Sequence, residues 1–138
     1  MPLTECAGTE PDRASVLNRR ARLEEVMRRD GPVCVWCGRH IDTALVGATT
    51  EHVVPRSKGG PSWIENELAA CGRCNHDRGH SGLAEFADEC DGLGRVPDRG
   101  ALVAALERLD QVIAVRGGQR RARRYLDSQL RRLRNQLR

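Results

Sequence analysis

Two Cys-x-x-Cys pairs constrain this chain more than any other feature of its sequence. The first pair is Cys34 and Cys37, the second is Cys71 and Cys74, and 33 residues lie between them. A tight turn with this spacing lets two thiolates reach one ion. Two such turns supply the four sulfurs that zinc prefers in a structural tetrahedral site. We therefore expect a fold built around a four-cysteine zinc site, with no coordination position left open for catalysis.

Two disulfides or a redox dithiol are the alternatives for these four cysteines. The first residues lack the basic and apolar segments of a secretory signal, so we expect a cytoplasmic protein, in which disulfides are rare. A redox dithiol needs only one pair. Cys6 and Cys90 are left over, and we interpret both as plain small residues. No apolar run approaches the roughly 20 residues that cross a bilayer, so no membrane partner is expected.

The positive charge of the chain is concentrated at its C-terminal end. The formal net charge is +4, but residues 116–138 carry nine arginines and a single acid, Asp127. Lys58 is the only lysine among the 23 basic residues, and arginine favours planar, bidentate contact with phosphate. A cationic tail on a nearly neutral body is typical of contact with a polyanion. A solvated helical face or a dimer seam is the alternative interpretation.

The hydrophobic pattern predicts an α+β chain with helices at both ends. Short β-branched stretches indicate strands, helical spacing of apolar residues indicates helices, and glycine and proline mark the turns between them. We expect a helix over about 12–29, ended by Asp30-Gly31-Pro32; strands over 43–46, 51–54 and 68–70; and short helices over 73–79 and 82–90.

Two longer helices are expected to close the chain. Their apolar faces are marked by Leu102, Leu106, Leu109 and Ile113, and by Leu126, Leu130, Leu133 and Leu137. Gly117-Gly118 lies between the two sets, which predicts a helical hairpin. The chain then divides into an N-terminal helical extension (1–32), a core (33–80) and a C-terminal helical region with the Arg-rich hairpin (81–138).

Residues 51–80 contain the polar groups that suggest chemistry. Glu51-His52 places an oxygen ligand beside a base that is neutral near pH 7. Neighbouring side chains on a strand point to opposite faces, so these two flank one site only if the strand end is bent or a metal lies near its edge. Asn66 precedes a candidate strand. Asn75 directly follows Cys74 at the start of a helix, so a zinc site would fix its position.

This stretch resembles the HNH (His-Asn-His) endonuclease family, in the subgroup with two Cys-x-x-Cys zinc knuckles. The resemblance covers about residues 33–80, and it rests on Cys34, Cys37, Glu51, His52, Pro55, Gly59, Gly60, Asn66, Leu68, Cys71, Cys74 and Asn75. It implies a ββα-metal (His-Me finger) core, in which two antiparallel strands, a long loop and one helix surround a single divalent ion.

The resemblance also implies a role for each site residue. His52 would be the general base that takes a proton from the attacking water, and Asn66 would hold the His52 region in its working orientation. Glu51 and Asn75 would bind one Mg²⁺ or Mn²⁺, which stabilises the charge that develops on the scissile phosphate. His76 is the alternative ligand to Asn75, and it would suit a softer transition metal.

The sequence therefore predicts a metal-dependent endonuclease that hydrolyses DNA phosphodiester bonds, with RNA open as a substrate and a homodimer compatible with cleavage. A non-catalytic zinc-containing nucleic-acid-binding module is one rival. A protein adaptor that dimerises through the leucine-striped hairpin is another. The residues expected to contact nucleic acid are Arg56, Lys58, Arg73, Arg78, Arg120, Arg121, Arg123 and Arg124.

Overall fold

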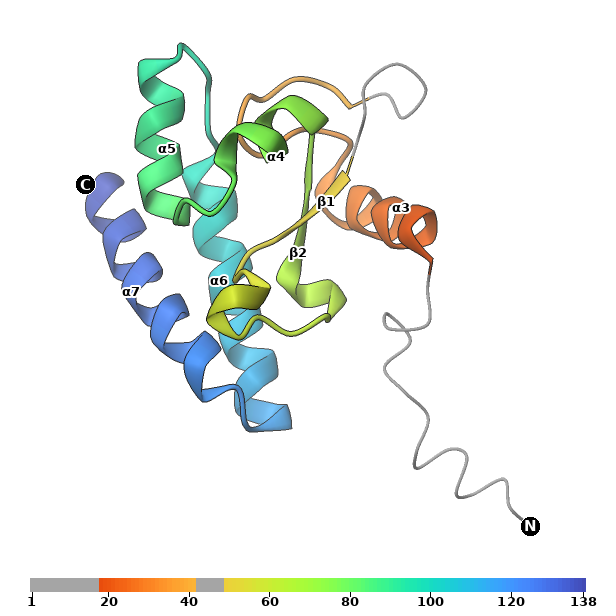
Figure 1. The fold of residues 1–138 in the computed structure, drawn as a ribbon, viewed down its shortest axis with the longest axis vertical. Helices are drawn as coiled ribbons and strands as arrows, with labels where there is room; N and C mark the ends of the chain where they lie inside the picture. The colour runs from red at the N-terminus through yellow and green to blue at the C-terminus, as the bar shows by residue number, and fades with distance from the viewer. Residues whose placement is uncertain (1–17, 42–48) are drawn as a thin grey trace.

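A small antiparallel sheet and one helix form the centre of the molecule. The computed structural model describes residues 18–41 and 49–138 (Figure 1). Within them, β1 (Thr49–His52) pairs with β2 (Glu67–Ala70), so that His52 lies opposite Glu67. α4 (Gly72–Arg78) follows β2 directly and packs on β1. This β–β–α order confirms the predicted α+β fold with its ββα core.

The loop between the strands contains two short 3-10 helices, η1 (Arg56–Lys58) and η2 (Ile64–Asn66). The strand predicted over 51–54 is wrong at its end, because β1 stops at His52 and Val53 and Val54 form a bend. Gly60 packs directly against this bend. A Cβ atom at Gly60 would lie 1.8 Å from the Val54 carbonyl oxygen, so no other residue fits there without moving the loop. The strand predicted over 43–46 lies outside the described residues.

On one side of the sheet, α3 (Arg19–Asp30) packs against both strands through Leu23 and Val26. The Asn18 side chain caps the helix by accepting a hydrogen bond from the Ala21 amide at 2.8 Å. The helix ends at Gly31, whose φ of 91° suits a glycine, as the sequence predicted. The first residues of the predicted helix, 12–17, lie outside the described part of the chain.

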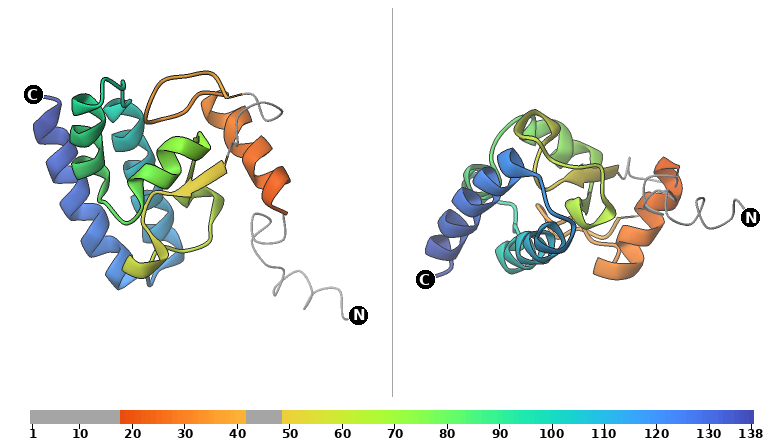
Figure 2. Two further views of the ribbon diagram at one scale, coloured as in Figure 1. Left: turned by 45° about the horizontal axis from the view of Figure 1, so that its top comes forward. Right: turned by 90° about the horizontal axis from the view of Figure 1, so that it is seen from below.

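Three helices lie on the side of the molecule opposite α3: α5 (Leu83–Gly92), α6 (Arg99–Arg116) and α7 (Arg120–Gln136) (Figures 1 and 2). α6 and α7 form the predicted hairpin, with Gly117 and Gly118 between them at φ values of 81° and 74°. The predicted apolar faces are buried, apart from Leu137, which is 54% exposed. Leu126, Leu130 and Leu133 therefore pack within their own chain, and a homodimer stays a prediction.

The buried apolar residues form one cluster that runs from α3 to α7. Trp36 and Phe86 are both fully buried, with their rings edge to face at 4.8 Å between centroids. The division into three segments stays a prediction about organisation. Among the described residues, no helix combines the length and the apolar character that crossing a membrane requires.

Candidate active site and metal centre

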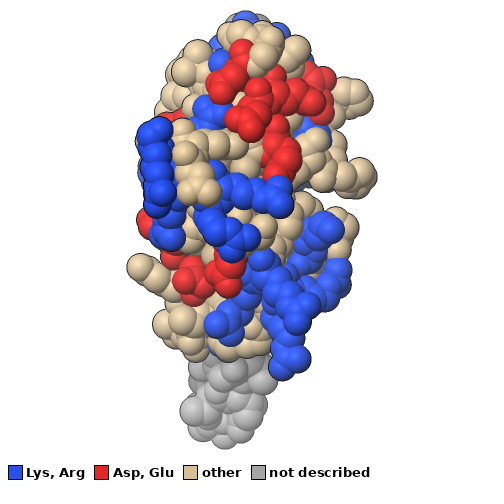
Figure 3. Space-filling view, turned by 90° about the vertical axis from the view of Figure 1, so that its left-hand side faces the viewer, with Lys and Arg blue, Asp and Glu red and all other residues tan. Residues whose placement is uncertain are grey.

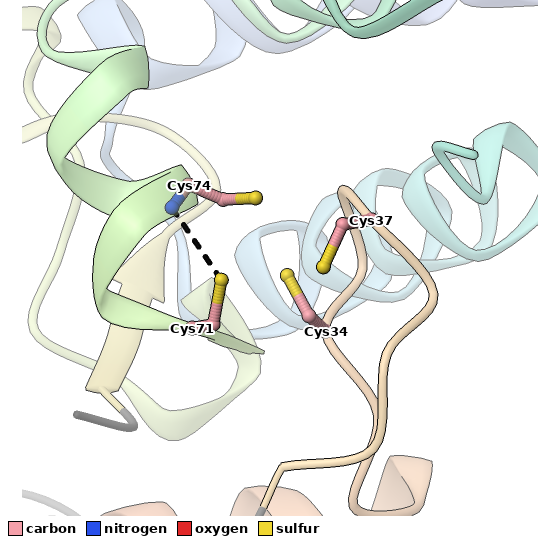
Figure 4. A group of neighbouring side chains, drawn as sticks. All are labelled: Cys34, Cys37, Cys71 and Cys74. Atoms are coloured by element: carbon pink, nitrogen blue, oxygen red, sulfur yellow. Dashed lines mark hydrogen bonds between the residues drawn. The ribbon is translucent and has the colours of Figure 1, made fainter. Parts of the chain in front are cut away.

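The four paired cysteines come together from two separate turns (Figure 4). Cys34 and Cys37 lie on the turn after α3, and Cys71 and Cys74 lie at the start of α4. All four are buried, and their sulfur atoms lie within 4.8 Å of one another. A tetrahedral zinc with Zn–S bonds of about 2.3 Å separates its sulfurs by about 3.8 Å, so the cluster has the size of such a site. We call these four residues the four-cysteine cluster.

Hydrogen bonds orient three of these four sulfurs. The Cys71 sulfur accepts from the Cys74 amide at 3.5 Å, and the Cys34 sulfur accepts from the Trp36 amide at 3.4 Å. Arg95 donates to the Cys74 sulfur at 3.5 Å. These donors stabilise thiolate charge, so the donor set fits a divalent zinc ion. None of the described cysteines forms a disulfide, including the fifth one, Cys90.

Glu51 is buried and held by two donors. The Trp36 indole nitrogen donates to Glu51 Oε2 at 2.6 Å, and the Arg78 guanidinium forms an ion pair with Glu51 Oε1. Arg78 also donates to the carbonyl oxygens of His52 and Ser81, each at 3.0 Å. Burial raises the pKa of the Glu51 carboxyl, and the charge of Arg78 offsets part of that rise. A buried carboxylate thus has both of its oxygens oriented.

His52 lies at the end of β1 and is half-buried. Its Nε2 atom is buried and has no hydrogen-bond partner among the described residues. Burial lowers the pKa of His52 below its ordinary value of 6.5, and the positive charges of Arg56, Arg22 and Arg78 lower it further. The imidazole is therefore a neutral base near pH 7 with one nitrogen unused.

Asn66 is fully buried and closes the loop between the strands. Its side-chain oxygen accepts from the Val54 amide at 2.8 Å, and its side-chain nitrogen donates to the carbonyls of Val54 and Pro61 at 3.0 and 2.9 Å. These bonds fix the two residues that follow His52. Such contacts are what a residue that orients the His52 region would make, and this role of Asn66 stays a prediction.

One cavity of about 240 Å³ brings together three of the four predicted catalytic residues, Glu51, His52 and Asn75; Asn66 is not among its lining residues, and His80 is. The bend after His52 explains how neighbouring strand residues share it. Its carboxylate and amide oxygens are the donors that Mg²⁺ and Mn²⁺ prefer, so the residues fit a hard divalent ion by donor type. His76 is exposed and does not line this cavity. We call this space the active-site cavity.

The residues predicted to contact nucleic acid divide into two groups. Arg56, Lys58 and Arg73 are exposed, as are the arginines in the first turns of α7: Arg120, Arg121, Arg123 and Arg124. Arg78 differs from the expectation, because it is 4% exposed and its guanidinium is committed to Glu51. Arg78 also lines the active-site cavity, so its contact with nucleic acid stays a prediction.

Comparison with known proteins gives a family match over part of the chain. Residues 34–90 match the model of the family described as HNH endonuclease, in agreement with the resemblance found in the sequence. No curated protein matches the chain. Among solved structures, it is similar to the type II-C Cas9 enzyme from Actinomyces naeslundii, with 18% identity and a TM-score of 0.49. That alignment covers 96% of this chain and 13% of the Cas9 chain.

Sequence reasoning missed three residues beside the site. Trp36 is the first, because its indole nitrogen donates a hydrogen bond to Glu51. Arg19 and Arg22 line a second cavity next to His52. Their spacing of three residues on a predicted helix was a signal that they share a face.

Proposed function

We propose that this chain is a metal-dependent endonuclease that hydrolyses phosphodiester bonds in DNA. The observation that carries the proposal is the active-site cavity, which joins Glu51, His52 and Asn75 and contains a neutral imidazole with an unused nitrogen. The family match over residues 34–90 supports a nuclease. The finer assignments of substrate, metal and residue roles are ours.

In this proposal His52 is the general base. Nε2 takes a proton from a water molecule, the water oxygen bonds to phosphorus, and the bond to the leaving oxygen breaks. Asn66 keeps the base in place through its bonds to Val54, and Arg56 lies close enough to bind a phosphate oxygen. General-base catalysis of this kind contributes about 10²- to 10⁴-fold.

Glu51 and Asn75 would hold the catalytic Mg²⁺ or Mn²⁺. Such an ion, when bound, offsets the negative charge that develops on the phosphate and the leaving oxygen. Trp36 and Arg78 orient the Glu51 carboxylate from the protein side. Cys71 and Cys74, in the first turn of α4, fix the position of Asn75. The backbone N–H of Asn75 donates to the Cys71 carbonyl at 3.0 Å. His76 remains the alternative ligand, at an exposed position outside the cavity.

The four-cysteine cluster would hold a structural zinc ion. Four protein thiolates fill a tetrahedral sphere, so this ion binds no substrate water. Its task is to join the turn after α3 to the start of α4, the helix that carries Asn75 and Arg78.

The DNA-binding surface would combine the loop after β1 with α7. Figure 3, which faces the α7 side, shows Lys and Arg side chains gathered over much of this face. α7 is docked on η1: Arg121 donates to the Ser57 carbonyl at 2.5 Å, and a Cβ at Gly59 would lie 2.9 Å from the Arg121 Cβ. The α7 arginines therefore occupy fixed positions near Arg56. Binding through phosphates should weaken steeply with salt.

Nicking of supercoiled plasmid in Mg²⁺ or Mn²⁺ tests the proposal. The wild type should nick, His52→Ala should lose at least about 100-fold in rate, and His40→Ala should match the wild type, because His40 is exposed and lines neither cavity. Equal nicking by wild type and His52→Ala would remove His52 from the mechanism. Plasmid binding without nicking under any metal would favour the non-catalytic binding module.

A further inference from the structure

A second cavity, of about 620 Å³, opens on the α3 side of His52, and we call it the α3 cavity. Its lining includes three arginines, Arg19, Arg22 and Arg56, and the hydroxyl-bearing Thr49, Thr50 and Ser62. His52, Asn75 and Glu67 also line it, so the lining side chains in the described part of the chain are all polar. Most small-molecule sites are lined mainly by apolar side chains, whereas this one suits a hydrated anion.

The charge of the α3 cavity is positive over residues 18–41 and 49–138, where three guanidinium groups and one carboxylate line it. Glu67 is buried and already pairs with Arg22, whose Nε donates to Glu67 Oε1 at 3.2 Å. Arg22 also donates to the Ser62 carbonyl at 3.2 Å. Arg22 is therefore held rigidly in the wall, and the exposed Arg19 and Arg56 supply the excess charge.

The α3 cavity and the active-site cavity meet at the proposed general base. His52, Arg56 and Asn75 line both. A polynucleotide with its scissile phosphate at His52 continues away from the site in two directions. One direction leads toward η1 and α7. The other leads toward α3, which lies on the opposite side of the two strands from α7 (Figure 1), and into the α3 cavity.

We infer that the α3 cavity is a binding subsite for a backbone phosphate of the strand being cut, next to the scissile phosphate. Arg19 and Arg56 contact this phosphate, and the hydroxyl groups of Thr50 and Ser62 donate to its oxygens, whereas the Thr49 hydroxyl already donates to the Thr50 carbonyl at 3.1 Å. The inference rests on the proposed function and names the part of the substrate that one side of the site takes. It gives the N-terminal helix a role in positioning the strand.

Arg19 and Arg20 provide a matched pair for the test. Both are exposed in the first turn of α3, and only Arg19 lines the cavity. Binding of a fluorescein-labelled DNA duplex is measured by anisotropy across a salt series, without Mg²⁺ or chelator, so that cleavage is not required. Arg19→Ala should weaken binding about 3- to 10-fold and make the slope of log K against log salt shallower by about 0.9 for the one lost phosphate contact. Arg20→Ala should change binding less than twofold, and Arg19→Lys should restore most of the affinity.

Equal weakening by Arg19→Ala and Arg20→Ala would mean that only the overall charge of α3 matters, and it would overturn the subsite. So would wild-type binding by Arg19→Ala. These outcomes are separate from failure of the proposed function. A wild type that never nicks DNA, yet shows the Arg19-specific loss, keeps the phosphate subsite and removes the hydrolysis. Nicking that depends on His52 and not on Arg19 keeps the hydrolysis and removes the subsite.

Discussion

Replacing Arg78 by methionine should destabilise the protein severely, because it leaves the buried Glu51 carboxylate without its positively charged partner. The Glu51 and Arg78 side chains are 5% and 4% exposed and form an ion pair. Removing one member of such a pair costs about 3–5 kcal/mol, since the other charge stays buried without compensation. A small domain is stable by only about 5–15 kcal/mol, so this loss is a large part of the total. At roughly 3–5 °C per kcal/mol for a chain of this length, Tm should fall by about 10–20 °C.

Urea unfolding followed by circular dichroism, with zinc present throughout, measures this cost. Arg132→Met is the matched control, because it breaks an ion pair with Glu85 whose members are 55% and 45% exposed. An exposed pair contributes about 0–1 kcal/mol. Glu51→Gln combined with Arg78→Met should recover at least half of the loss, since the introduced amide is neutral and its oxygen still accepts from the Trp36 indole. The buried pair does not act as described if Arg78→Met lowers the free energy of unfolding no more than Arg132→Met does. The same holds if the loss in the double variant equals the sum of the losses in Glu51→Gln and Arg78→Met.

Three further predictions concern the supports of the site. Trp36→Phe keeps an aromatic ring beside Phe86 but removes the donor to Glu51, so urea unfolding should show a loss of about 1.5–3 kcal/mol; a loss below about 0.5 kcal/mol would refute the role of the indole. Gly60→Ala should reduce both stability and nicking, because its Cβ would meet the Val54 carbonyl. Gly92→Ala is the control: Gly92 lies in open space at the end of α5, so this change should be neutral or stabilising by up to about 1 kcal/mol. Removal of zinc by a chelator should release one metal ion per chain and abolish the cooperative unfolding transition; an unchanged transition in metal-free protein would show that the four-cysteine cluster folds without an ion.

The parts of the fold that depend on local spacing could be predicted from the sequence. The Cys-x-x-Cys turns, the Gly31 helix end and the leucine faces of α6 and α7 each follow from residues a few positions apart. The end of β1 could not be predicted in this way. Val53 and Val54 favour a strand locally, but the side chain of Asn66, 12 residues from Val54, takes the Val54 backbone groups and bends the chain.

The candidate site shows the same division. Motif order placed Glu51, His52 and Asn75 in one site, and the structure brings them to one cavity. The burial of Arg78 could not be predicted from neighbouring residues, because its partner Glu51 is 27 residues away. An arginine beside a nuclease motif is equally expected at the surface. Only the packing of α4 on β1 decides that this guanidinium turns inward.

The position of Trp36 makes its fluorescence sensitive to the structure around the four-cysteine cluster. This indole is fully buried between two of the clustered cysteines, and the second tryptophan, Trp63, lies under the Arg116 guanidinium at 4.4 Å. In a Trp63→Phe background, all indole emission comes from the turn that contains Cys34 and Cys37, two residues of the proposed zinc site. Loss of the ion would expose that ring to water and shift its emission to longer wavelength, so ion occupancy could be followed in the cuvette while a substrate is being turned over.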